Sequence, residues 1–140
     1  LVCIPHPLGR RPFPAEADVG FADNGRFVPS PRLLRANRLL TTEVMARVDL
    51  LEVINSRTQF AGTWAATRRL AASCGLPQTA GSDAHTAGEI GHARAVLSDF
   101  DDAATFLTAI RDARLSGIKS SAFVHLASMS AKLRRRGCSD

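Results

Sequence analysis

The apolar residues of this chain gather in a few short runs, separated by polar and by glycine- and proline-rich stretches. Residues 48–54 (VDLLEVI) are mostly apolar, which is typical of a strand buried on both faces in a parallel sheet. Residues 1–4 have the character of the last part of another buried strand, which Pro5 stops. Residues 76–81 predict a third short strand, and residues 95–97 a further one.

Helical spacing of apolar residues marks several segments between and after these runs. Ser30 followed by Pro31 is typical of a capped helix start, and Thr86 with Glu89 has the spacing of a capping box. We therefore expect one helix from Pro31 to Leu40, others over residues 60–74, 101–114 and 123–136, and a short one starting at Thr86.

Strands that alternate with helices predict parallel βα units, so the fold class is α/β. Three or four such units are too few to close a barrel. The chain is then either a small open sheet or part of a larger barrel. The intervening residues 8–31 are rich in Pro, Gly, Asp and Asn and predict a long irregular loop, which in compact domains is often functional.

Composition fits one ordinary globular domain or a piece of a larger one. The chain has 140 residues, of which 45% are apolar and 22% charged, enough apolar content for a core. No apolar run approaches the roughly 20 residues that cross a bilayer, and no signal peptide opens the sequence, so no membrane association is expected. The odd, widely spaced Cys3, Cys74 and Cys138 suggest no disulfide framework and favour a reducing, cytoplasmic setting.

The net charge of +5 favours an anionic partner such as a phosphate ester or nucleic acid, with simple solubility as the alternative. Much of the excess lies in residues 132–136 (KLRRR) near the end of the chain. The chain has one Trp and no Tyr, so aromatic stacking platforms for single-stranded nucleic acid are not evident.

Three side chains at predicted strand ends are candidate metal ligands. Asp83 and His85 follow the third strand, and side chains two apart on an extended chain point the same way. One carboxylate and one imidazole suit a divalent first-row metal. His6 ends the first strand, where Pro7 is expected to hold it extended, and could add a third ligand. The alternatives are a helix N-cap at Asp83 with an exposed His85, and a turn histidine at position 6.

Polar residues near the same strand ends are candidates for substrate contacts. Asn55 ends the second strand and could hydrogen-bond substrate, or simply terminate the strand. Glu52 lies an odd number of residues away, so in a regular strand only one of the two faces the site, and we choose Asn55. Arg10, Arg11 and Arg57 could fork onto phosphate oxygens, with a solvated surface role as the alternative.

These residues resemble the later motifs of the PHP (polymerase and histidinol phosphatase) domain. The similar segments are His6-Pro7, residues 52–57 (EVINSR), residues 79–86 (TAGSDAHT) and residues 89–91 (EIG), in the family's order and spacing. The resemblance extends over residues 1–97, and its specific part is the GSDAHT…EIG stretch.

The resemblance implies the carboxyl-terminal portion of a distorted (β/α)7 TIM-like barrel, with barrel elements in residues 1–100 and terminal helices with a basic tail in residues 101–140. It implies His6, Asp83 and His85 as ligands of divalent metal ions, for which Mn, Zn and Fe are all suitable. The family's earlier His-x-His motif, its bridging Glu and a further His have no counterpart in this sequence. We therefore expect a partial domain.

The resemblance further implies metal-dependent hydrolysis of a phosphomonoester or phosphodiester, with a phosphorylated small molecule, a nucleotide or a nucleic acid end as substrate. Arg10 or Arg57 would offset negative charge in the transition state. Two alternatives stay open: a non-catalytic remnant or regulatory domain without tight metal binding, and a nucleic-acid-binding module that uses the basic carboxyl terminus. The residues do not fix the ester, the native metal or the oligomeric state.

Overall fold

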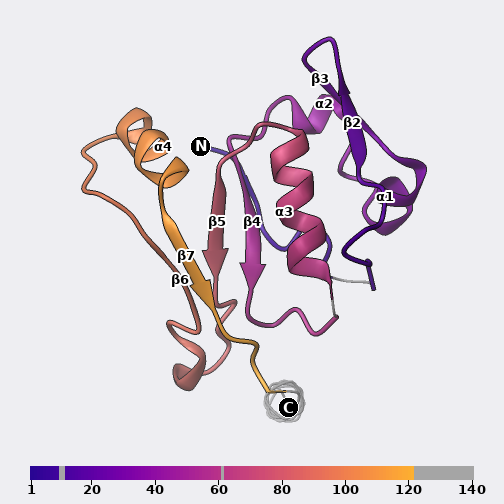
Figure 1. Ribbon diagram of the computed structural model, residues 1–140. Helices are drawn as coiled ribbons and strands as arrows, with labels where there is room; N and C mark the ends of the chain where they lie inside the picture. Colours follow the sequence, from indigo (N-terminus) through magenta and orange to yellow (C-terminus); the bar gives the residue numbers. More distant parts are fainter. Residues whose placement is uncertain (10–11, 61, 122–140) are drawn as a thin grey trace, which may run out of the picture.

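The computed structural model describes residues 1–9, 12–60 and 62–121. Its centre is a parallel sheet of β1 (Cys3–Ile4), β4 (Leu50–Asn55) and β5 (Gln78–Gly81), in the order β1-β4-β5. Figure 1 shows β4 and β5 side by side and pointing in the same direction. The three predicted strands and their parallel pairing are confirmed.

Two small antiparallel sheets accompany the parallel one. β6 (Ala93–Val96) pairs with β7 (Arg114–Gly117), and β2 (Gly20–Asp23) pairs with β3 (Arg26–Pro29). The α/β class is therefore confirmed, but the described residues form an open three-stranded sheet with small sheets beside it and show no portion of a barrel. The fourth strand was predicted, but its partner β7 was not.

The hairpin of β2 and β3 lies inside the segment that we expected to be irregular. Its two-residue turn is Asn24-Gly25, and both residues have positive φ, 47° and 77°. This is the conformation of a tight hairpin turn, for which Asn-Gly is the preferred sequence. The prediction of a loop throughout residues 8–31 is therefore wrong, although the sequence contained the turn signal.

The helices are shorter than the periodicity predicted. They are α1 (Pro31–Ala36), α2 (Thr42–Met45), α3 (Thr63–Ser73), the 3-10 turn η1 (Ala87–Glu89) and α4 (Ala103–Arg111). The Ser30 cap is confirmed, because its side chain accepts a hydrogen bond from Leu33 N at 3.1 Å. The single helix expected up to Leu40 is divided, because Asn37 is extended and Thr41 caps a new helix.

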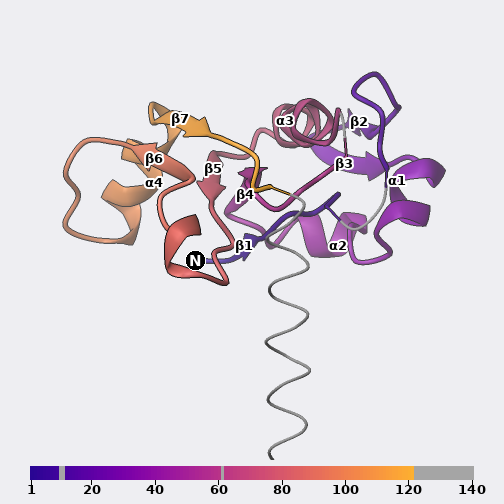
Figure 2. The ribbon, with the colours of Figure 1, turned by 90° about the horizontal axis from the view of Figure 1, so that it is seen from below.

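The hydrophobic core joins the sheet and α3 to buried side chains from residues 8–48. Ala66, Leu70 and Ala71 of α3 and Leu51 of β4 are all fully buried. Both faces of β4 are covered, since Val53 and Ile54 are also buried, as expected for a central parallel strand. Figures 1 and 2 show β6, β7 and α4 on one side of β4 and β5, and β2, β3, α1 and α2 on the other.

Three further expectations concern the rest of the chain. Cys3 and Cys74 are free cysteines, whereas Cys138 lies outside the described residues. The predicted last helix at residues 123–136 and the basic tail also lie outside them. Among the described residues, no helix has the length and apolar character needed to span a membrane.

Candidate active site

The carboxyl ends of the three parallel strands meet at one open cavity of about 240 Å³, which we call the strand-end pocket. Its lining residues are His6, Gly9, Asn55, Arg57, Thr58, Asp83 and His85. Five of the seven predicted site residues therefore lie around one space, although they come from three distant parts of the sequence. The other two, Arg10 and Arg11, lie outside the described residues.

Two of these residues have a left-handed backbone. His6 has a φ of 31° and Asp83 a φ of 51°, a region that residues other than glycine rarely adopt. Such conformations cost about 1–3 kcal/mol each and cluster at functional sites. The expectation that Pro7 holds His6 extended is wrong, because His6 begins a turn in which Gly9 N donates to the His6 carbonyl at 2.9 Å.

Asp83 and His85 also reach the pocket by a route other than the one expected. They do not alternate along an extended chain, since Asp83 is left-handed. Nδ1 of His85 lies 2.8 Å from the Asp83 carbonyl oxygen and 3.8 Å from Asp83 Oδ1. A carbonyl oxygen only accepts hydrogen bonds, so Nδ1 carries the proton in this contact. In the neutral ring, Nε2 then has the lone pair that a metal ion or a proton needs.

Glu52 does not line the pocket but forms hydrogen bonds with two residues that do, His6 and Asn55. Its Oε2 accepts hydrogen bonds from His6 N at 2.7 Å and from Asn55 Nδ2 at 3.1 Å. Asn55 lines the pocket and Glu52 does not, although their side chains are hydrogen-bonded where the pairing of β4 with β5 shifts register between Glu52 and Ile54. Asn55 Oδ1 accepts from Arg57 N at 3.0 Å, so this buried amide shapes the strand end. Its predicted contact with substrate stays a prediction.

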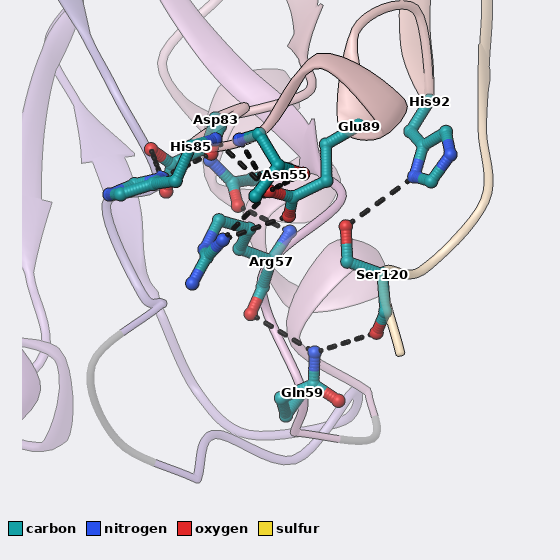
Figure 3. Close-up of polar contacts among 9 residues, drawn as sticks. Asn55, Arg57, Gln59, Asp83, His85, Glu89, His92 and Ser120 are labelled. Atoms are coloured by element: carbon teal, nitrogen blue, oxygen red, sulfur yellow. Dashed lines mark hydrogen bonds and ion pairs between the residues drawn. The ribbon is translucent and has the colours of Figure 1, made fainter. Parts of the chain in front are cut away.

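Glu89 is a functional candidate that the sequence indicated as a capping residue and as the first residue of the EIG segment, but not as a partner of Arg57. Its Oε1 lies 2.8 Å from Arg57 Nη1, and the two side chains are only 1% and 9% exposed. Its Oε2 accepts from the backbone N of His85 at 3.0 Å and of Thr86 at 3.1 Å. Figure 3 shows this carboxylate between Arg57 and the residues that follow β5. The predicted capping box is confirmed, but the same carboxylate also binds an arginine of the pocket.

Opposing effects act on the pKa of Glu89. Burial raises it, but hydrogen bonds from His85, Thr86 and Ser120 and the charge of Arg57 together lower it to about 2. Glu89 is therefore ionised at neutral pH and balances the positive charge of Arg57. The Arg57–Glu89 pair adds no net charge to the strand-end pocket, so Arg57 attracts a phosphate less strongly than an unpaired arginine would.

The segment after β7 forms hydrogen bonds with residues near the strand-end pocket through Ser120. Ser120 N donates to Ser56 O at 2.7 Å, and Gln59 Nε2 donates to Ser120 O at 3.1 Å. Ser120 Oγ lies 3.5 Å from His92 Nδ1, as Figure 3 shows. The chain after β7 thus ties the end of β4 to the turn that follows η1.

The pocket residues fit a metal ion only in part. Asp83 and His85 place one carboxylate and one imidazole in the same corner, and His6 lines the same space. Within residues 1–9, 12–60 and 62–121, however, no three or more His, Cys, Asp or Glu side chains form a group that could hold a metal. Protein metal sites of this kind usually have at least three protein ligands. The described residues therefore form no complete metal site, and Asp83 and His85 would need a further ligand to hold an ion.

A second hollow, of about 420 Å³, lies at the opposite end of β5. It is formed by α3, the start of β5 and the turn between α4 and β7, and it shares no residue with the strand-end pocket. None of its lining residues is a carboxylate, a histidine or a cysteine, so it offers no ligands for metal chemistry.

Comparison with known proteins gives one family match. Residues 65–115 match the family model described as PHP-associated. No curated protein and no solved structure matches the chain. The matched segment runs from α3 to the start of β7 and contains Asp83, His85 and Glu89, but not His6 or Asn55. The match bears out the predicted resemblance to PHP proteins for residues 65–115.

Proposed function

We propose that this chain provides part of the active site of a metal-dependent phosphoester hydrolase of PHP type. The observation that carries the proposal is the gathering of His6, Asn55, Arg57, Asp83 and His85 around one pocket at the ends of parallel strands. Such strand ends are where active sites form in α/β folds. The left-handed backbone of His6 and Asp83 supports a functional reading of the same residues.

Asp83 and His85 would hold the ion through a carboxylate oxygen and Nε2, with His6 as the nearest candidate for a further ligand. Mn, Zn and Fe all suit this mixed oxygen and nitrogen set. A bound divalent ion supplies Lewis-acid activation of water and neutralises phosphate oxygens. Ligands from beyond the described residues would complete the site.

The other pocket residues would orient these groups. The Asp83 carbonyl fixes the His85 ring by accepting from Nδ1, and Glu52 fixes the backbone of His6. Glu89 holds Arg57 at the pocket wall, where the guanidinium would contact an oxygen of the phosphoryl group. Arg10 is proposed for a similar contact. The substrate would be a phosphorylated small molecule or a nucleotide.

Turnover of p-nitrophenyl phosphate and of bis(p-nitrophenyl) phosphate with Mn²⁺ tests the proposal in the full-length protein. We expect hydrolysis of at least one of the two by the wild type, and none above background when Asp83→Ala and His85→Ala are combined. Asp99→Ala, which changes an exposed aspartate outside the pocket, is the matched control and should retain activity. Equal turnover by the double variant and the control would refute the proposed site.

A non-catalytic regulatory domain is the second candidate. It is favoured by the absence, among the described residues, of a group of three metal-binding side chains. A folded full-length protein that binds no metal and hydrolyses neither ester would support it. The nucleic-acid-binding alternative depends on residues 132–136, which lie outside the described part of the chain, and it stays a prediction.

A further inference from the structure

A cavity of about 480 Å³ adjoins the strand-end pocket, and His6 lines both. We call it the flanking cavity. One wall is the corner Pro5-His6-Pro7 at the end of β1, and the other is the turn between α1 and α2, which includes Arg38 and Leu39. Because both cavities border on His6, a ligand that occupied both would lie against this residue.

The two walls of the flanking cavity are fastened to each other. Asn37 Nδ2 donates to the Pro7 carbonyl at 3.0 Å, and Asn37 Oδ1 accepts from Leu39 N at 3.0 Å. The turn that carries Arg38 and Leu39 is thus held against the His6 corner. Because the walls are preformed, binding a ligand there requires little ordering of the chain.

The lining of the flanking cavity has a distinct chemical character. It contains two proline rings, Leu39 and one guanidinium, and no carboxylate. Leu39 is 71% exposed, so its apolar surface is available to a ligand in the cavity. Arginine guanidinium groups stack on aromatic faces, and proline and leucine offer apolar contact to the same rings. The volume lies within the range of small-molecule sites.

We propose that the flanking cavity binds the organic group of the phosphoester and that this group is aromatic. The inference rests on the proposed function, since it places the phosphoryl group in the strand-end pocket. The aromatic ring lies between the proline corner and Leu39, with Arg38 against its face or edge. Phosphoesters of small aliphatic alcohols leave this cavity empty and bind more weakly.

Two phosphonates that cannot be hydrolysed test the assignment by calorimetry in the full-length protein with Mn²⁺. We expect phenylphosphonate to bind about tenfold more tightly than methylphosphonate, because its ring loses contact with water in the cavity. Leu39→Ser and Arg38→Ala should each reduce this ratio while leaving the affinity for methylphosphonate unchanged. Val44→Ser and Arg35→Ala are the matched controls, because both residues are exposed and neither lines the cavity.

The outcomes separate this inference from the proposed function. Equal affinities for the two phosphonates, or a preference that survives Leu39→Ser and Arg38→Ala, overturn the inference, while hydrolysis of p-nitrophenyl phosphate would still support the function. If the wild type binds neither phosphonate and hydrolyses no phosphoester, the proposed function fails and the inference fails with it.

Discussion

At the scale of single residues, two carboxylates organise the strand-end pocket. Glu52 ties His6 to Asn55, and Glu89 ties Arg57 to the backbone at His85. Neither carboxylate lines the cavity itself. The pocket residues come from separate segments, so these two side chains determine how the segments are placed relative to one another.

The depressed pKa of Glu89 predicts a specific dependence of stability on pH. Its pKa in the folded state is about 2, below the ordinary value of 4.5, so its ionised form stabilises the fold. This contribution is complete above pH 4.5 and is lost as the pH falls from 4.5 toward about 2. Glu89→Gln should therefore be less stable than the wild type at neutral pH, and the difference should shrink through this window.

Urea unfolding between pH 2 and 7 measures this difference. Glu16→Gln, a change of an exposed glutamate in the segment before β2, is the control and should show no such convergence. A constant difference between Glu89→Gln and the wild type across the whole range would contradict the role assigned to the Glu89 charge.

The pocket residues could be predicted from the sequence because strand ends in α/β folds converge, which brought His6, Asn55 and Asp83 together. The backbone conformations of these residues could not be predicted from the sequence. The left-handed backbone of His6 is accompanied by the hydrogen bond from His6 N to Glu52, a contact that the local sequence does not specify. The role of Glu89 as a partner of Arg57 likewise depends on a contact between residues 32 positions apart.

At the scale of elements, irregularities explain most differences between expectation and structure. Regular alternation would place Glu52 and Asn55 on opposite faces of β4, but the strand shifts register between Glu52 and Ile54 and their side chains are hydrogen-bonded. The extended Asn37 divides a helix that periodicity predicted as continuous. The register shift in β4 and the extended Asn37 both interrupt a regular element locally. The pattern of apolar residues does not predict such interruptions.

Gly81 is the position in β5 where this packing is tightest. A Cβ at residue 81 would overlap Oε1 of Glu52, the carboxylate that holds His6 and Asn55. Gly81→Ala should lower the free energy of unfolding by about 1–3 kcal/mol, because Glu52 must move. Gly88→Ala is the matched control, since a Cβ there meets nothing within 4 Å. Thermal or denaturant unfolding of both variants measures the effect, and equal stabilities would contradict it.

At the scale of the whole molecule, the parallel direction of β1, β4 and β5 followed from the sequence, whereas the arrangement of the remaining strands did not. Short apolar runs separated by helices predicted the parallel strands. The barrel was inferred from resemblance alone, and the described residues show an open sheet with β6 and β7 paired antiparallel beside it. The pairing of β6 with β7 joins segments about 20 residues apart through a helix, which local patterns do not specify.

The stability of the whole molecule should depend on the contact between α3 and the sheet. Leu70 is fully buried in the core, and Leu70→Ala should reduce the free energy of unfolding by about 2–5 kcal/mol. Val96→Ala changes a residue that is 59% exposed and should have an effect within about 0.5 kcal/mol. Urea denaturation compares the two, and similar losses would contradict a core centred on α3.

The central claim is that Asp83 and His85 bind a divalent metal at the ends of the parallel strands. The most direct measurement is a titration of the full-length protein with Mn²⁺, followed by the loss of the electron paramagnetic resonance signal of the free ion. We predict that Asp83→Ala and His85→Ala each weaken binding by at least about tenfold, the loss that follows even from removing a partner of a metal ligand. Asp99→Ala should bind as the wild type does. Unchanged Mn²⁺ affinity in both pocket variants, or no binding by the wild type, would contradict the claim.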